Sequence, residues 1–140
     1  MGTRASEDKA AILDLIVGLA DSAQATIATT LREFDAPASV ALPLRILALS
    51  EEPVTPRDLA RRLGRDPSTA SLTADKLEDA GLIARRPHPD DGRKRVLVLT
   101  DRGRQLWSAM RDRLHESGVF ERLTRPQQRQ LLDLLTRMRG

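Results

Sequence analysis

The sequence predicts a mainly α-helical protein with one small β-hairpin. Three observations favour this fold class. Apolar residues recur at helical spacing near both ends of the 140-residue chain, two helix-start signals flank Gly64, and extended segments with a polar tip follow over 82–100. We therefore expect two short helices joined by a tight turn, then a hairpin, with longer helices before and after.

The N-terminal third predicts two helices. Ser6 is a candidate N-cap, and apolar residues then recur every three or four positions as far as Phe34, which predicts one long helix over 6–35. Pro37 ends it, because proline disfavours helical geometry in the preceding residue. The densely apolar stretch up to about Ser50 predicts a second, buried helix with Pro43 in or near its first turn.

Start and stop signals for two short helices follow. The segment 55–58, Thr-Pro-Arg-Asp, has the N-cap, N1 proline and N3 acid of a capping box, and Gly64 is a natural left-handed stop. Asp66 and Pro67 begin the next helix, which we expect to end at Gly81. Helical spacing places its inward positions at Ala70, Ala74 and Leu77.

The pattern changes after Gly81. Residues 82–86 and 95–100 are extended and flank a tip rich in proline, aspartate, glycine and cations, which predicts a β-hairpin. Thr100 and Thr124 then cap two C-terminal helices within 101–139. Two short helices followed at once by a basic-tipped hairpin form a winged helix-turn-helix, here over residues 39–100.

Five motifs between residues 59 and 103 occur in a characteristic order and spacing. They are Leu59-Ala60-Arg61-Arg62-Leu63-Gly64, Asp66-Pro67-Ser68-Thr69, Lys76-Leu77-Glu78-Asp79-Ala80-Gly81-Leu82-Ile83, Asp91-Gly92-Arg93 and Leu99-Thr100-Asp101-Arg102-Gly103. Together they resemble the MarR family of bacterial transcriptional regulators. The resemblance implies one domain over 1–140, with helices 6–35 and 101–139 pairing in a homodimer and 39–100 reading double-stranded DNA.

Charge along the chain is uneven. The net charge of +3 divides into −4 over residues 1–53, +4 over 54–105 and +3 over 106–140. A basic segment attracts phosphate through counterion release, although the same surplus also serves solubility. The positive field thus coincides with the predicted winged helix-turn-helix.

Candidate DNA-contacting residues follow from this arrangement. In the second short helix, side chains suited to major-groove edges and a phosphate are Ser68, Thr69, Ser71, Thr73 and Lys76. In the wing, we expect Arg93 to enter a narrow minor groove with Asp91 orienting its guanidinium, while Lys94 and Arg95 neutralise phosphates. Further candidates for phosphate contacts are Arg57, Arg61, Arg62 and Arg65. The competing interpretation for each is a helix cap or a solvated charge.

The flanking helices are too apolar to be left in water, so we expect them to form a two-fold interface, packing within a monomer being the alternative. The dimer would place its two recognition helices about 34 Å apart on a pseudo-palindromic operator. The family resemblance also implies a small ligand, often aromatic, between the dimer helices and the reading head. Trp107 is a candidate to line that site or to belong to the core.

Other functions have little support in the sequence. The chain has no cysteine, and its two histidines, His88 and His115, lie in no catalytic or metal-binding motif, so we expect neither an enzyme, a cofactor nor a metal site. No run of about 18 uninterrupted apolar residues occurs, so we expect a cytoplasmic protein without a membrane helix. The main rival is a winged-helix module that binds protein, which Leu72 in the recognition helix makes conceivable.

Overall fold

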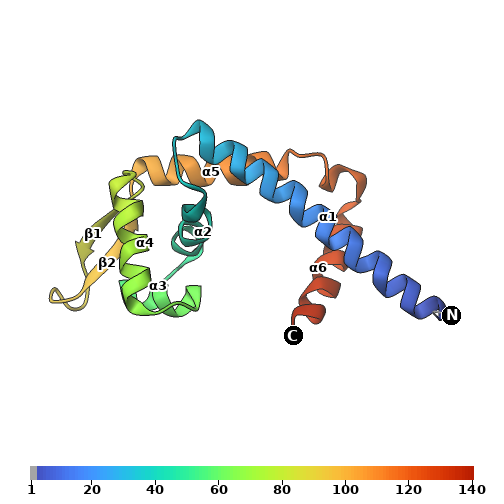
Figure 1. Ribbon diagram of the computed structural model, residues 1–140, viewed down its shortest axis with the longest axis horizontal. Helices are drawn as coiled ribbons and strands as arrows, with labels where there is room; N and C mark the ends of the chain where they lie inside the picture. Colours follow the sequence, from blue (N-terminus) through green and yellow to red (C-terminus); the bar gives the residue numbers. More distant parts are fainter. Residues whose placement is uncertain (1–2) are drawn as a thin grey trace.

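Helices dominate the structure, and a single antiparallel hairpin accompanies them. The computed structural model describes residues 3–140, with its elements in the predicted order (Figure 1). The helices and strands are α1 (Arg4–Glu33), α2 (Ala41–Leu49), α3 (Pro56–Leu63), α4 (Pro67–Asp79), β1 (Ile83–Pro87), β2 (Arg95–Leu99), α5 (Asp101–His115) and α6 (Arg125–Arg139), with 3-10 turns η1 (Ala38–Val40) and η2 (Phe120–Arg122). The predicted fold class is therefore confirmed.

Local signals set most helix ends. The Thr55 hydroxyl accepts a bond from the Asp58 amide at 3.1 Å, and the Asp58 carboxylate accepts one from the Thr55 amide at 3.0 Å, which completes the predicted capping box. Gly64 ends α3 with φ of 63°. One prediction was wrong: Thr3, not Ser6, is the N-cap of α1, and the Ser6 amide already bonds to the Thr3 carbonyl inside the first turn.

The head comprises residues 41–115, from α2 to α5, and one hydrophobic core joins its helices to the hairpin. Five fully buried leucines meet there: Leu44 of α2, Leu59 of α3, Leu77 of α4, Leu82 just before β1, and Leu106 of α5. Because each element contributes to one cluster, the position of α4 relative to the hairpin is determined by packing as well as by the chain connection.

The hairpin is held at its base. Its register runs from Ile83 opposite Leu99 to Pro87 opposite Arg95, and the Leu97 amide donates to the Val54 carbonyl at 2.8 Å. This bond joins the strand to the segment just before α3. The wing therefore projects from a fixed base beside the short helices.

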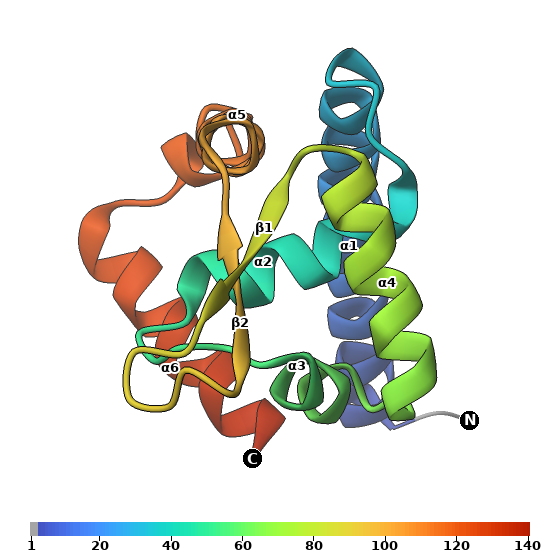
Figure 2. The same cartoon turned by 90° about the vertical axis from the view of Figure 1, so that its left-hand side faces the viewer.

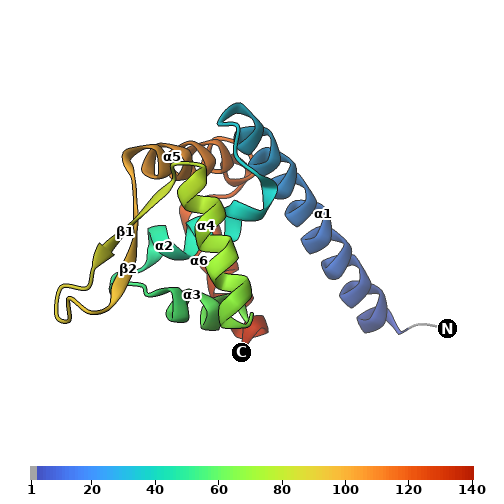
Figure 3. The ribbon, with the colours of Figure 1, turned by 60° about the vertical axis from the view of Figure 1, so that its left-hand side comes forward.

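Helices α1 and α6 extend away from the head in Figure 1, and Figure 3 shows the same for α1. Only the C-terminal end of α1 is buried, at Thr30 and Leu31, and α6 has no buried residue. The Arg113 side chain fastens this end of α1 to α5, donating to Thr30 at 3.2 Å and pairing with Glu33 at 2.5 Å. By length and composition alone, and against our expectation, α1 is also long and apolar enough to cross a membrane, although soluble-protein helices pass the same test.

Candidate nucleic-acid interface

One end of the head gathers the elements expected to read DNA. The wing tip, α3 and the N-terminal end of α4 all lie at the lower end of the head in Figures 2 and 3. Rotation about the vertical axis does not change height, so the three elements lie at the same end of the molecule in every view. An elongated polyanion can therefore contact all three elements at once.

Helix α4 divides into a buried and an exposed face. Ala70, Ala74 and Leu77 are fully buried, as predicted. Residues on the opposite side are exposed, and they include Ser68, Ser71, Leu72, Asp75 and Lys76. This exposed face is the part of α4 available to a groove.

Thr73 does not belong to the exposed face. It is only 8% exposed, and its hydroxyl donates to the Thr69 carbonyl at 3.1 Å. Its position three residues after Ala70 and four before Leu77 places it in the same inward stripe. The expectation that Thr73 offers its side chain to a base edge was wrong.

Asp66 organises the first turn of α4. Its carboxylate accepts the Thr69 amide at 3.0 Å and the Thr69 hydroxyl at 2.7 Å, and it also accepts a bond from the Ser68 hydroxyl. The Ser68 hydroxyl, followed by the Thr69 amide and hydroxyl, holds the pKa of Asp66 well below its ordinary value. In this arrangement the Ser68 and Thr69 hydroxyls donate to Asp66, so toward any other partner they can act only as acceptors.

The wing tip is a closed turn with three exposed cations. The His88 amide donates to the Lys94 carbonyl at 2.8 Å, and the Lys94 amide donates to the Asp91 carbonyl at 3.0 Å. Arg93, Lys94 and Arg95 are all exposed. Their charges therefore project from a defined loop.

The role expected of Asp91 needs correction. Its carboxylate accepts a bond from the backbone amide of Arg93 at 3.1 Å, and among residues 3–140 it makes no ion pair with the Arg93 guanidinium. The short spacing explains this, because an aspartate readily bonds a backbone amide two residues later. Asp91 thus shapes the turn through the Arg93 backbone and does not orient the Arg93 guanidinium.

Arg85 connects the wing to α4, and sequence reasoning missed it. Its guanidinium bonds Asp75 at 2.7 Å and Glu78 at 2.8 Å, both on the exposed side of α4. The hydrogen bond to Asp75 raises the pKa of Arg85 above its ordinary value. The available signal was the pair of acids three residues apart on one helix, followed by an arginine in the next strand.

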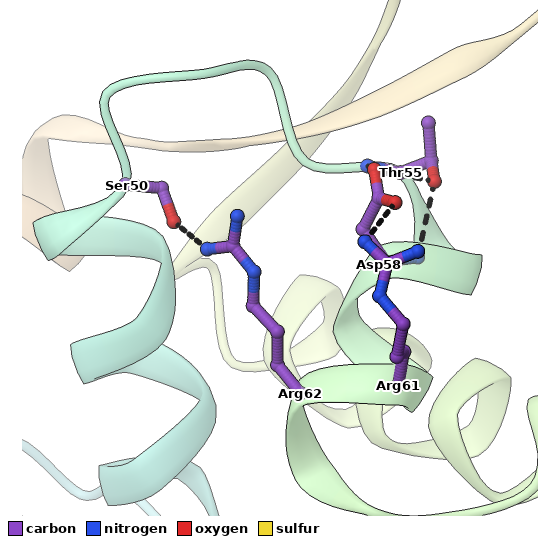
Figure 4. A network of polar contacts seen from close by, with 5 residues as sticks. All are labelled: Ser50, Thr55, Asp58, Arg61 and Arg62. Atoms are coloured by element: carbon purple, nitrogen blue, oxygen red, sulfur yellow. Dashed lines mark hydrogen bonds and ion pairs between the residues drawn. The ribbon is translucent and has the colours of Figure 1, made fainter.

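The α3 arginines differ in their surroundings. Figure 4 shows Arg61 paired with Asp58, at 3.0 Å, and Arg62 donating to the Ser50 hydroxyl. The Thr55 amide is the main cause that lowers the pKa of Asp58. Arg57 is exposed, whereas Arg65 lines a hollow between α1, α2 and α5. Among these four arginines, Arg65 is thus placed to contact a molecule in this hollow as well as a phosphate.

Known proteins resemble both the sequence and the fold. The MarR family model matches residues 44–94, from α2 to the wing tip. The HTH-type transcriptional repressor Rv2887 of Mycobacterium tuberculosis is 36% identical over 93 residues, which cover 64% of this chain and 67% of that protein. The chain belongs to the MarR family. The matched part contains α3, α4 and the wing tip described above.

Solved structures of this family extend the likeness over nearly the whole chain. A MepR variant from Staphylococcus aureus has a TM-score of 0.75 at 25% identity and covers 91% of this chain and 94% of its own. CouR from Rhodococcus jostii, solved with p-coumaroyl-CoA, has a TM-score of 0.69 at 24% identity and covers 98% and 95%. A second MepR variant, solved with an oligodeoxyribonucleotide, has a TM-score of 0.64 at 24% identity and covers 91% and 94%.

Family membership makes this MarR-family chain a winged-helix, DNA-binding transcriptional regulator. Its relatives are named as regulators, which is not a class of enzyme. The histidines have local contacts instead: the His88 ring accepts a bond from the Asp90 amide at 3.0 Å, and His115 packs edge-on against Phe120. In the described part of the chain, no group of three or more potential ligands lies together to hold a metal ion.

Proposed function

We propose that this MarR-family protein is a cytoplasmic repressor that binds a pseudo-palindromic operator as a homodimer. The observation that carries the proposal is the common orientation of the exposed face of α4 and the cationic wing tip at one end of the head (Figure 2). With α4 in a major groove, the wing lies over the neighbouring backbone and minor groove. Ser68, Thr69, Ser71 and Lys76 then face bases or phosphates.

The wing supplies the second part of the contact. We place the Arg93 side chain in a minor groove, where narrow A·T-rich segments have an enhanced negative potential. Lys94, Arg95, Arg57, Arg61 and Arg62 contribute phosphate contacts. Such contacts fix the register of the protein on the duplex, while α4 discriminates among bases.

The proposed dimer would bury apolar side chains that a single chain leaves exposed to water. Helix α1 exposes Ile12, Leu13, Leu15, Val17 and Leu19, and α6 exposes Leu131, Leu132, Leu134, Leu135 and Met138. Large apolar side chains exposed in such numbers on two helices are typical of a protein interface. A second copy of the chain is the occupant we propose, with residues 1–140 forming one domain, and burial between copies also accounts for the apolar character of α1.

A ligand site is the remaining part of the proposal. A hollow of about 520 Å³ lies between α1, α2 and α5, lined by Ile27, Arg45, Arg65, Trp107 and Met110 among others. Trp107 is both packed against the core and part of this lining. Apolar walls with two cations favour an aromatic or acyl compound that carries a negative charge. CouR, a relative of this fold, was solved with p-coumaroyl-CoA.

The test is footprinting on DNA flanking the gene, or on duplexes selected from a random pool, at two salt concentrations. We expect a symmetric protected site, affinity that falls with salt, and a salt dependence smaller by about one unit of logarithmic slope in Arg93→Ala. A salt-independent interaction, or protection unchanged in Arg93→Ala, would contradict the wing contact.

Two matched measurements address the dimer and the ligand. Leu132→Glu should shift the mass in sedimentation equilibrium towards the monomer, whereas Leu49→Glu, which changes a similarly exposed leucine outside α1 and α6, should not. Trp107 is the single tryptophan and the chain has no tyrosine, so its fluorescence reports on a ligand that binds beside it in the hollow. A compound that both alters this fluorescence and releases DNA supports the ligand site, and release without a fluorescence change opposes it.

A further inference from the structure

Leu72 is an apolar residue at the centre of the exposed face of α4. Its side chain is 63% exposed, while Thr73 and Ala74 beside it are buried. Ser68 lies one turn before it and Lys76 one turn after it on the same side of the helix. Leucine is therefore placed where the proposed function brings α4 against base edges, and the core makes little use of it.

The chemistry of a major groove limits what Leu72 can contact. Leucine has no hydrogen-bonding group, so it gains from burial only against another apolar group. The 5-methyl group of thymine is the apolar group on the major-groove edge of the standard bases. Placing leucine against any other base edge would instead remove water from polar atoms without replacing their hydrogen bonds.

The neighbouring side chains are compatible with A·T pairs. Ser68 and Thr69 donate their hydroxyl protons to Asp66, so they are disposed to accept from exocyclic amino groups such as that of adenine. The usual bidentate partner of guanine is arginine or lysine, and the first two turns of α4, 67–75, contain neither. The cation at Lys76 follows only after Leu72.

We propose that Leu72 is a specificity-determining residue, which contacts the 5-methyl group of one thymine in each half-site of the operator. The inference rests on the proposed function, because it assumes that α4 enters a major groove. It adds to that function a chemical class of sequence: a half-site with a thymine opposite the second turn of α4.

The test removes the methyl group from the DNA and the side chain from the protein. Each symmetric pair of thymines in the selected operator is replaced in turn by deoxyuridine, which changes no hydrogen-bonding group. Burial of one methyl group corresponds to about a fourfold change in affinity, so we expect wild type to lose roughly fifteenfold when both half-sites are altered at the critical position. The Leu72→Ala variant should bind the thymine operator more weakly and be insensitive to deoxyuridine at that position alone.

Leu49→Ala is the matched control, since Leu49 is 58% exposed on α2 and lies outside the exposed face of α4. It should keep the full response to deoxyuridine. The inference is overturned if Leu72→Ala retains that response at every thymine, or if it loses capture of a protein partner while binding DNA normally. Sequence-independent DNA binding by wild type would overturn the proposed operator and this inference together. If instead wild type binds a specific operator and Leu72→Ala keeps the full response to deoxyuridine, only the inference is overturned.

Discussion

Replacing Gly103 by alanine tests how the hairpin is attached to α5. A methyl group at Gly103 would lie 2.1 Å from the backbone carbonyl oxygen of Leu82, far inside normal contact distance. That same carbonyl accepts the Thr100 amide at 3.0 Å, and Thr100 also bonds the Gly81 carbonyl. Helix α5 therefore has to move away from the start of the hairpin, since a backbone atom has no rotamer through which to withdraw.

The expected magnitude combines three effects. Overpacking a close contact costs about 1–3 kcal/mol, and weakening the Thr100 bond costs about 1 kcal/mol. The better helix propensity of alanine returns about 1 kcal/mol. We expect a net loss of about 2 kcal/mol in the free energy of unfolding, which corresponds to a melting temperature lower by about 6–8 °C for a chain of this size.

Thermal unfolding at one fixed protein concentration measures this difference, since dimer stability depends on concentration. Gly92→Ala is the matched control, because an added Cβ at Gly92 meets nothing within 4 Å. We expect that variant to melt within about 2 °C of wild type. Equal melting temperatures for Gly103→Ala and Gly92→Ala would refute the close packing of α5 on the hairpin.

Variants at three other positions, Arg85, Asp58 and Thr55, probe the reading head. Arg85→Gln should weaken operator binding severalfold while lowering stability by less than about 1 kcal/mol, because its ion pairs are partly exposed. Arg111→Gln, which breaks a pair with Asp112 inside α5, should leave binding unchanged, and equal binding losses would oppose a positioning role for Arg85. The pKa of Asp58 lies below its ordinary value of 3.8 in the folded chain, so its stabilisation is present above that pH and is lost as pH falls further. The free energy of unfolding, measured with urea, should therefore fall less steeply below pH 4 in Asp58→Asn than in wild type. Parallel pH curves for the two proteins would argue against this cap. Thr55→Ala should cost about 1 kcal/mol in urea unfolding, whereas Thr55→Ser should cost far less, and equal losses would show that the hydroxyl is not the stabilising group.

Sequence reasoning succeeded where the structure depends on neighbouring residues. The N-caps at Thr55, Asp66, Thr100 and Thr124 all bond backbone amides three residues later, as their spacing predicts. Gly64 ends α3 for an equally local reason. These signals need no knowledge of the tertiary structure, so they could be recognised in the sequence.

The errors have different physical causes. Thr73 completes a stripe with Ala70, Ala74 and Leu77, a pattern that its polar side chain concealed. Asp91 bonds the nearer backbone amide of Arg93, a local competitor of the expected side-chain contact. Arg85 was missed because its partners come from another element, and contacts between elements depend on a packing that spacing does not reveal.

The central claim is that two copies of the reading head contact adjacent turns of one operator. Hydroxyl-radical and major-groove footprinting of wild type on its selected operator tests it most directly. We predict two protected major-groove regions with centres about 10–10.5 base pairs apart, flanked by minor-groove protection that is lost in Arg93→Ala. A single unsymmetrical region, or flanking protection that persists in Arg93→Ala, would contradict the account.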